Sequence, residues 1–219
     1  MNVTDALYAR KSIRNFLDKP VPNTLLAELL EKAARAPSGG NLQPWRVYVI
    51  NGPSMDRFLA FNKGRPASET PEYPVYPPNL KEPYRTSRFE LGEAMYAKLG
   101  IPREDKPARL AHLARNMCFF DAPAAIFCYV DRVMGLPQWS DLGMFLQSFM
   151  LVAEEAGLNT CAQEAWASRP DTVTQFVEAP AELMLFCGVA VGYADPVAPV
   201  NQLESARQPL SHWATFIET

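Results

Sequence analysis

Histidine and cysteine, the residues that most often hold catalytic metals, are scarce in this chain. It has two histidines, His112 and His212, and neither belongs to an HExxH pattern or to another cluster of metal-ligand residues. Metal catalysis is therefore not expected. The four cysteines, Cys118, Cys128, Cys161 and Cys187, include no CxxC pair, and three of the four lie in apolar stretches. This spacing favours reduced thiols over a zinc site or a disulfide framework.

The chain also lacks the short motifs of several large enzyme classes. There is no GxSxG turn, no GxxxxGK[ST] loop and no GxGxxG segment after a predicted strand, which argues against hydrolase, NTPase and Rossmann folds. Lys and Arg total 21 against 24 Asp and Glu, a formal charge of −3. Such a chain is not expected to bind nucleic acid through its overall charge, although a local basic patch is compatible with this balance.

Long apolar runs are absent as well. The longest, Leu183–Ala194, has twelve residues, fewer than the roughly 20 that a membrane-crossing helix requires. The N-terminus carries Asp5, Arg10 and Lys11 before any apolar stretch develops, so it lacks the hydrophobic centre of a secretory signal. We therefore expect no membrane association and a cytoplasmic protein.

Patterns of both helical and strand type are present, and we assign all 219 residues to a single domain. Apolar spacing predicts helices at 5–8, 24–35, 54–63, 85–99, 108–115 and 140–156, and a capping box at 168–171 predicts one more, ending near 177. Thr4 is the expected cap of the first helix, and Gly100 and Gly157 are expected to end two others. Strands are predicted at 45–50, 124–130 and 183–193, the last buried on both faces.

The segment from 64 to 84 contains six prolines mixed with tyrosines, which precludes regular structure. A long extended segment of this kind is either a functional lid or a linker. Because it is rich in aromatic residues rather than in Gly and Ser, we favour the lid. Stacking side chains suit flat ligands, so Tyr73, Tyr76 and Tyr84 are candidate substrate contacts, with core packing or loop filling as the alternative.

A cationic cluster follows the first predicted helix. Arg10, Lys11, Ser12 and Arg14 place two guanidiniums, an ammonium and a hydroxyl within five residues. Such groups form charge-assisted hydrogen bonds to a dianionic phosphate, each worth roughly 1.5–3 kcal/mol. Taken alone, the cluster is equally compatible with a solvated basic corner.

A polar loop, PSGGNLQPW at 37–45, follows the second predicted helix. Its glycines allow the backbone to approach a flat ligand, and its Ser, Asn and Gln side chains supply donors and acceptors. An ordinary helix-to-strand turn is the alternative interpretation.

The chain contains, in this order, the RKSIR cluster, the PSGGNLQPW loop, a long helix entered through Asp141-Leu142-Gly143, the Gly157-Leu158 stop and a late Arg207-Gln208-Pro209-Leu210. Together these motifs resemble the nitroreductase superfamily of FMN-dependent oxidoreductases. The resemblance covers nearly the whole chain. It implies an α+β fold with a mixed, mostly antiparallel central sheet flanked by helices. It also implies a homodimer that exchanges its C-terminal tails and holds FMN at the interface.

The resemblance assigns roles to residues of this chain. Arg10, Lys11 and Ser12 match positions that hold the FMN phosphate and ribityl chain, Arg207 completes the phosphate clamp, and Arg14 lies near the pyrimidine edge of the flavin. The partner subunit is expected to lay its own loop against the flavin ring, through Pro37, Ser38, Gly39, Asn41 and, close by, Gln43.

The segment Gln163-Glu164-Ala165 lies where the family places a backbone N–H against flavin N5. Glu164 and Ala165 are therefore candidates for that contact, and Gln163 for cofactor binding. Many members of the family have glycine at the position of Ala165, and Glu164 is also compatible with a surface carboxylate.

The implied activity is a ping-pong reaction. NAD(P)H reduces the flavin by hydride transfer and leaves, after which a nitroaromatic or quinone is reduced in the same space. A cation such as Arg14 would stabilise the reduced flavin and raise its redox potential.

Two alternatives remain open at this stage. One is a specialised flavin reaction on the same fold, such as reductive dehalogenation of an aromatic, for which Glu90, Glu93, Tyr96 and Lys106 lie in the corresponding region without matching spacing. The other is a non-catalytic module that binds flavin.

Overall fold

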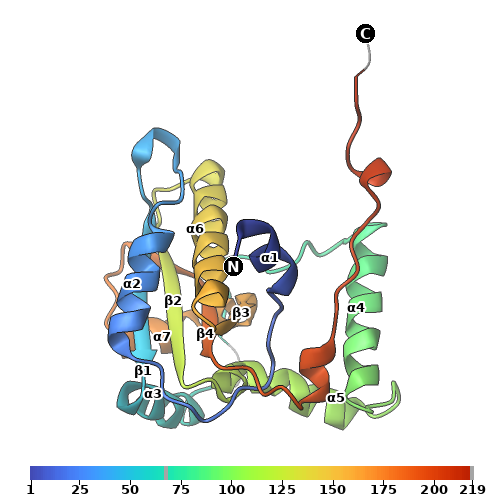
Figure 1. The fold of residues 1–219 in the computed structure, drawn as a ribbon. Helices are drawn as coiled ribbons and strands as arrows, with labels where there is room; N and C mark the ends of the chain where they lie inside the picture. Colours follow the sequence, from blue (N-terminus) through green and yellow to red (C-terminus); the bar gives the residue numbers. More distant parts are fainter. Residues whose placement is uncertain (67–68, 218–219) are drawn as a thin grey trace.

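In the computed structural model, which describes residues 1–66 and 69–217, the fold centres on a four-stranded sheet (Figure 1). Its strands are β1 (Trp45–Asn51), β2 (Ala124–Asp131), β3 (Asn159–Gln163) and β4 (Leu183–Gly192). They lie in the order β1-β2-β4-β3, and each neighbouring pair is antiparallel. The central strands β2 and β4 are almost entirely buried, as their apolar sequences require.

Helices accompany the sheet at all the predicted places. They are α1 (Val3–Ala9), α2 (Asn23–Ala33), α3 (Pro53–Lys63), α4 (Tyr84–Lys98), α5 (Lys106–Ala114), α6 (Leu136–Glu155) and α7 (Pro170–Val177). Short 3-10 turns follow as η1 (Gly39–Asn41), η2 (Arg115–Asp121), η3 (Glu164–Ser168), η4 (Pro199–Gln202) and η5 (Leu210–His212). The architecture is thus α+β, with a central antiparallel sheet flanked by helices, as the sequence indicated.

The sheet divides the core into two layers. On one face, Leu29 of α2 and Phe149 of α6 pack against alternate residues of β2 and β4. On the other face, Phe58 of α3 and Trp166 of η3 form an aromatic cluster with Phe127 of β2. Helices α2, α3 and α6 bury an apolar stripe in this way, because their apolar residues recur with helical spacing, whereas α4 has no buried residue.

Several predicted boundaries need correction. The cap of α1 is Asn2 rather than Thr4: its side chain accepts from the Asp5 N–H at 2.9 Å. The long helix α6 begins at Leu136, several residues before the predicted start, because its exposed first turn carries no periodic apolar signal. Strand β3 was not predicted, since its five residues form no apolar run.

The predicted capping box at 168–171 is wrong. No side chain of that segment caps α7; the Ser168 hydroxyl instead donates to the Ala165 carbonyl at 2.7 Å. The cap comes from Glu69, whose carboxylate accepts from the backbone N–H of Asp171 at 2.7 Å and of Thr172 at 3.1 Å. The segment 64–84 has no helix or strand before Tyr84, as predicted, although its residues 67 and 68 lie outside those described.

The two ends of the chain meet at one side of the sheet. After α1 the backbone runs extended, Ile13 donates to the Thr160 carbonyl of β3 at 3.0 Å, and Phe16 bridges to Ala194 just beyond β4. The C-terminal tail then runs beside α4 and away from the sheet (Figure 1), and Gln208 donates to the Ser87 hydroxyl at 3.2 Å. This route brings residues at opposite ends of the sequence to one place.

Candidate functional site

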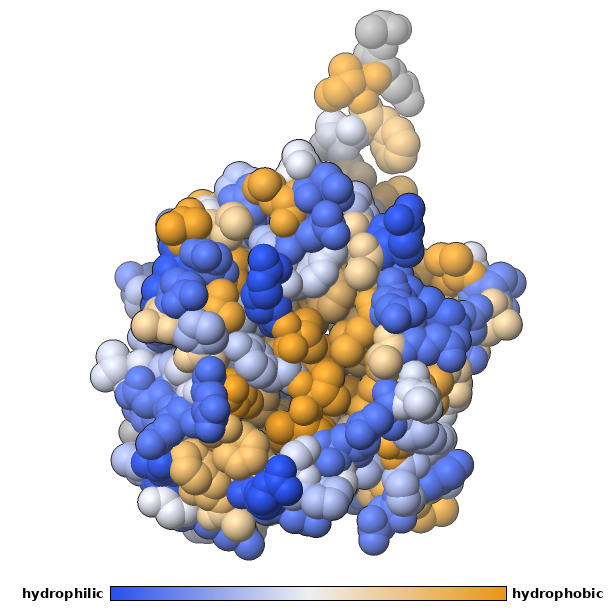
Figure 2. Space-filling view, turned by 90° about the vertical axis from the view of Figure 1, so that its left-hand side faces the viewer, coloured by the Kyte–Doolittle hydropathy of each residue, from blue (hydrophilic) through white to orange (hydrophobic). Residues whose placement is uncertain are grey.

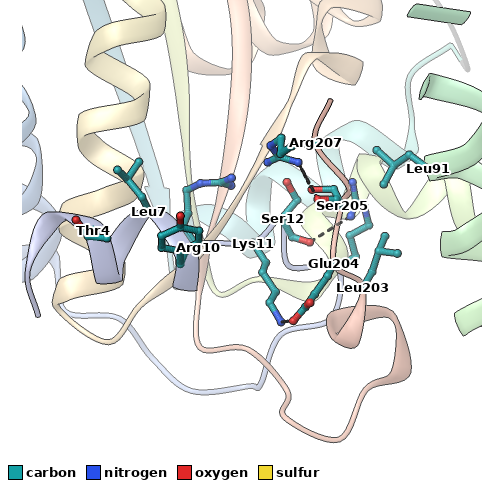
Figure 3. A pocket seen from close by; sticks show the side chains of 12 residues that line it. Thr4, Leu7, Arg10, Lys11, Ser12, Leu91, Leu203, Glu204, Ser205 and Arg207 are labelled. Atoms are coloured by element: carbon teal, nitrogen blue, oxygen red, sulfur yellow. Dashed lines mark hydrogen bonds and ion pairs between the residues drawn. The ribbon is translucent and has the colours of Figure 1, made fainter. Parts of the chain in front are cut away.

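A cavity of about 850 Å³ lies between α1, the tail at 203–207 and Leu91 of α4 (Figure 3). Ligand sites in proteins commonly enclose about 300–1,000 Å³, so the size suits a cofactor. Five of the residues predicted from the sequence line it together: Arg10, Lys11, Ser12, Arg14 and Arg207. The structure therefore joins the cationic cluster to a residue of the tail that follows it by almost the whole length of the chain.

The end of α1 explains how the cluster is presented. The Arg10 N–H closes the last turn of the helix on the Ala6 carbonyl at 3.0 Å, and the chain then becomes extended. In an extended chain alternate side chains face opposite ways. Ile13 points into the core, where it is 4% exposed, while Ser12 and Arg14 on either side of it line the cavity.

The cavity is strongly cationic. Its charged lining residues are four cations, Arg10, Lys11, Arg14 and Arg207, and one carboxylate, Glu204, so the balance is 4 − 1 = +3. Glu204 pairs with Lys11 at 3.3 Å. Figure 3 shows the guanidiniums of Arg10 and Arg207 pointing toward one another across the cavity. Like charges brought together in this way favour a multivalent anion between them.

Two of the arginines, Arg10 and Arg207, keep their charges available for such an anion. The Arg10 Nε is buried and has no hydrogen-bond partner among the described residues, although a buried donor normally has one. Arg207 donates within its own tail, to the Ser205 hydroxyl at 2.6 Å and to the Ala206 carbonyl at 3.0 Å. No ion pair between either arginine and a carboxylate is found within the described ranges.

The pKa of Glu154, a carboxylate on α6, is affected by two of the same cations. Burial raises the pKa of Glu154, and the opposing causes are a hydrogen bond from Asn159 and the charges of Arg10 and Lys11. The Asn159 amide lies 3.3 Å from the Glu154 Oε2. Glu154 does not line the cavity, so the cationic character of the lining itself is preserved.

The loop at 37–43 lies elsewhere on this chain. Its backbone packs on α6, where the Gly39 N–H donates to the Asp141 carboxylate at 3.2 Å, and the Ser38 hydroxyl accepts from the Gln43 N–H at 3.0 Å. Gly40, Asn41 and Gln43 have φ of 58°, 59° and 48°, a left-handed conformation that only glycine adopts freely. None of the predicted loop residues, Pro37, Ser38, Gly39, Asn41 and Gln43, lines the cavity.

The predicted N5 segment follows β3 and enters η3. Gln163 is buried, and its Nε2 donates to the carbonyl and to the side-chain oxygen of Asn116, each at 3.0 Å. Its Oε1 is buried without a partner in the described part of the chain. Glu164 is exposed and Ala165 half-buried, and neither lines the cavity.

The three candidate lid tyrosines have different surroundings. Tyr73 packs against Trp139 and Phe186, and its hydroxyl donates to the Phe186 carbonyl. Tyr76 is exposed and lies under the guanidinium of Arg88, 4.0 Å from its ring centroid. Tyr84, also exposed, begins α4. One tyrosine is therefore fixed to the sheet, and the other two present their rings to solvent.

Other residues of the site were missed by sequence reasoning. Leu91, Glu204 and Ser205 line the cavity, and Arg115 donates to the Arg14 carbonyl at 3.2 Å. No local signal could have found them, because they reach the cavity only through contacts between segments that are distant in the sequence. Across residues 1–66 and 69–217, no cluster of three metal-ligand residues and no helix able to span a membrane is found.

In this α+β protein, the size and positive charge of the cavity suit an anionic, phosphate-bearing ligand. The chain belongs to the nitroreductase family, whose sequence model matches residues 7–193. It is 35% identical to a nitrobenzene nitroreductase of Ectopseudomonas oleovorans, over 98% of this chain and 96% of that protein.

Solved structures agree with this assignment. The FMN and NADPH-dependent nitroreductase NfnB from Sphigopyxis sp. strain HMH is 42% identical, with a TM-score of 0.95 over 100% of both chains. The FMN-dependent nitroreductase NfnB from Mycobacterium smegmatis, solved in complex with NADPH, is 25% identical, with a TM-score of 0.92 over 99% of this chain and 98% of that one.

Proposed function

We propose that this protein is an FMN-dependent nitroreductase that oxidises NADPH and reduces nitroaromatic compounds. The observation that carries the proposal is the cationic cavity, in a chain 42% identical over its whole length to an FMN and NADPH-dependent nitroreductase. Nitrobenzene and 4-nitrobenzoate reductases are among the relatives, which favours nitro compounds over the dehalogenation and non-catalytic alternatives. A single domain over residues 1–219 and a cytoplasmic location are part of the proposal.

The residues present fit FMN at its phosphate end. A dianionic phosphate would neutralise most of the +3 balance of the cavity and would give the buried Arg10 Nε a partner. We assign phosphate and ribityl contacts to Arg10, Lys11, Ser12 and Arg207. Arg14 is assigned to the pyrimidine edge, with Gln163, Glu164 and Ala165 nearby. When bound, FMN supplies the hydride chemistry between NADPH and the nitro compound. No general acid or base is assigned to the protein.

A second copy of the chain completes the proposed site. The loop at 37–43 does not line the cavity of its own chain, and we assign it to the flavin of the partner. The tail supports this arrangement because it leaves the body of the molecule (Figure 1) with large apolar side chains exposed, namely Leu210, Trp213, Phe216 and Ile217. Side chains of this kind are normally covered by a partner.

The edge of the sheet offers a place for the partner's tail. Strand β1 is an edge strand, and beside it Leu26, Leu30 and Val49 line a groove of about 270 Å³. Figure 2 shows an apolar hollow on this side of the molecule. An uncovered edge strand is prone to pair with another chain. We therefore propose a homodimer in which each tail covers the β1 edge of the other protomer.

Steady-state kinetics of the FMN-reconstituted protein test the proposed activity. We expect NADPH oxidation to depend on a nitroaromatic such as nitrobenzene, with parallel lines when initial rates are plotted against both substrates, because both use one space in turn. Arg207→Ala should weaken FMN binding by about ten- to a hundredfold, since one charge-assisted phosphate contact is lost. A colourless protein after reconstitution would contradict the assignment, and intersecting lines would contradict the ping-pong reaction.

A further inference from the structure

Asn201 in η4 is a buried amide whose oxygen and two N–H donors are all hydrogen-bonded. Its residue is 7% exposed. Its Oδ1 accepts from the Arg14 N–H at 2.9 Å, and its Nδ2 donates to the Asn15 carbonyl at 2.7 Å and to the Asp195 carbonyl at 3.0 Å. Three bonds made by one short side chain hold it in one orientation.

These bonds join the two halves of the cationic cavity. Arg14 and Asn15 end the segment that carries the N-terminal cations, and Asn201 begins the tail that carries Arg207 six residues later. The Asp195 N–H, six residues before Asn201, also donates to the Asn15 carbonyl at 3.0 Å. Beyond Asn201, the tail meets the N-terminal segment through the pair of Lys11 and Glu204, whose side chains are 31% and 82% exposed. Exposed ion pairs contribute little, so the buried amide is the stronger connection.

The position of Arg207 depends on where its tail is anchored. Between η4 and η5 the tail has no helix or strand, and the hydrogen bonds that the structure gives to the Arg207 side chain all go to the tail itself, at Ser205 and Ala206. Arg14 is held on its other side as well, by the bond from Arg115 to its carbonyl at 3.2 Å. A fixed N-terminal segment and an anchored tail together set the distance between the cations.

We propose that Asn201 is a positioning residue for the phosphate end of the cofactor site. It does not line the cavity; it acts by holding Arg207 opposite Arg10 and Ser12. This inference rests on the proposed function, because it takes the phosphate of FMN as the anion that the cations receive.

Comparison of FMN with riboflavin, which lacks the phosphate, separates this role from a general structural one. Titrations of the apoprotein followed by flavin fluorescence give both affinities. We expect Asn201→Ala to raise the Kd for FMN about tenfold and the Kd for riboflavin less than about twofold, because Arg207 depends on the anchored tail whereas Arg14 is also held by Arg115. A variant that merely loosens the fold would raise the Kd for FMN and the Kd for riboflavin by the same factor.

Two further variants sharpen the test. Gln202→Ala is the matched control: Gln202 adjoins Asn201 in η4, but its side chain donates only to Pro196 within the tail, at 3.0 Å, so the ratio of the two affinities should stay at the wild-type value. In an Arg207→Ala background, Asn201→Ala should raise the Kd for FMN less than about threefold, since the residue that it places is gone. A full tenfold loss in that background would show that Asn201 does not act through Arg207.

The failures of the two proposals can be told apart. If the wild-type protein binds FMN no more tightly than riboflavin, the proposed phosphate site itself is wrong. If the wild-type protein prefers FMN and Asn201→Ala keeps that preference, only the role of Asn201 is overturned. Should Asn201→Ala fail to fold, Asn201→Ser carries the same comparison, because its hydroxyl can still replace one of the three hydrogen bonds.

Discussion

The hydroxyl of Tyr73 donates to the backbone carbonyl of Phe186, the extra residue of a β-bulge. Cys128 pairs with Cys187 and Tyr129 with Leu185, which leaves Phe186 without a residue opposite it on β2. A bulge interrupts the ladder of hydrogen bonds at its extra residue, and here a side chain of the proline-rich segment contacts that residue. Burial raises the pKa of Tyr73, so the hydroxyl stays protonated and able to donate at neutral pH.

Removal of this hydroxyl should therefore destabilise the fold. We expect Tyr73→Phe to lower the free energy of unfolding by about 1 kcal/mol, because the Phe186 carbonyl loses a partner. Denaturant unfolding measures the change. Tyr76→Phe is the control, since the Tyr76 ring lies exposed under Arg88, and equal effects of the two substitutions would contradict the role of Tyr73.

A methyl group at Gly188 should disturb the aromatic layer below the sheet. A side-chain carbon there would come well inside van der Waals contact with the Trp166 indole, which is fully buried and stacks on Phe119 at 4.6 Å between ring centroids. We expect Gly188→Ala to cost about 1–3 kcal/mol of unfolding free energy, as overpacking does in well-packed cores.

Thermal unfolding measures the effect of Gly188→Ala, and Gly92→Ala provides the opposite case for that measurement. Gly92 lies inside α4 with open space around it, so the substitution should stabilise the helix by about 0.5–1 kcal/mol. A Gly188→Ala protein as stable as wild type would show that the indole can move aside.

The stability of the protein should fall in mild acid because of His112. Burial lowers the pKa of His112, and the charges of Arg115 and Arg14 lower it further. The unfolded chain, with an ordinary histidine pKa near 6.5, therefore binds more protons than the folded chain just below that pH. The contribution of neutral His112 to the free energy of unfolding is complete above about pH 6.5 and is lost as the pH falls toward the pKa of His112 in the folded chain. Thermal midpoints between pH 5 and 8 should show a shallower acid slope for His112→Gln, and an unchanged slope would exclude His112 as the cause.

Arg14 should affect the potential of the flavin more than its binding. A cation near the pyrimidine edge stabilises the reduced anionic ring. If Arg14→Ala removes about 1.5–3 kcal/mol of that stabilisation, the two-electron midpoint potential should fall by roughly 30–60 mV. Potentiometric titration measures it, with Arg65→Ala as a control, because the Arg65 guanidinium lies over Phe61, 4.0 Å from its ring centroid. No shift for Arg14→Ala would place Arg14 away from the ring.

The tail should be required for assembly. A chain that ends at Gln208 lacks the exposed Leu210, Trp213, Phe216 and Ile217, and we expect it to sediment as a single copy with weakened FMN retention. Val49→Asp, in the groove beside β1 that would receive the partner's tail, should likewise shift the protein toward the monomer. Leu136→Ser is the control, since Leu136 is 82% exposed at the start of α6. A truncated chain that still sediments as a dimer would rule out tail exchange.

The elements with strong periodic patterns were predictable, and those without were not. Helices α2, α4 and α6 were foreseen from apolar spacing and from the breakers Gly100 and Gly157, which do adopt left-handed φ of 66° and 77°. Strand β3 was missed because its burial comes from pairing with β4 rather than from its own composition. The cap of α7 was misassigned because Glu69 reaches it from about a hundred residues earlier in the chain.

The local amino-acid sequence was enough to predict the apolar strands β2 and β4, the amphipathic helices, and a cationic cluster followed by a polar glycine loop. These features depend on the spacing of residues that are close in the sequence. Long-range folding added the meeting of Arg10 with Arg207, the amide of Asn201 between their segments, and the separation of the loop at 37–43 from the cavity of its own chain. Such contacts leave no periodic trace, because a polar side chain looks the same in a sequence whether it ends in water or in a buried hydrogen bond.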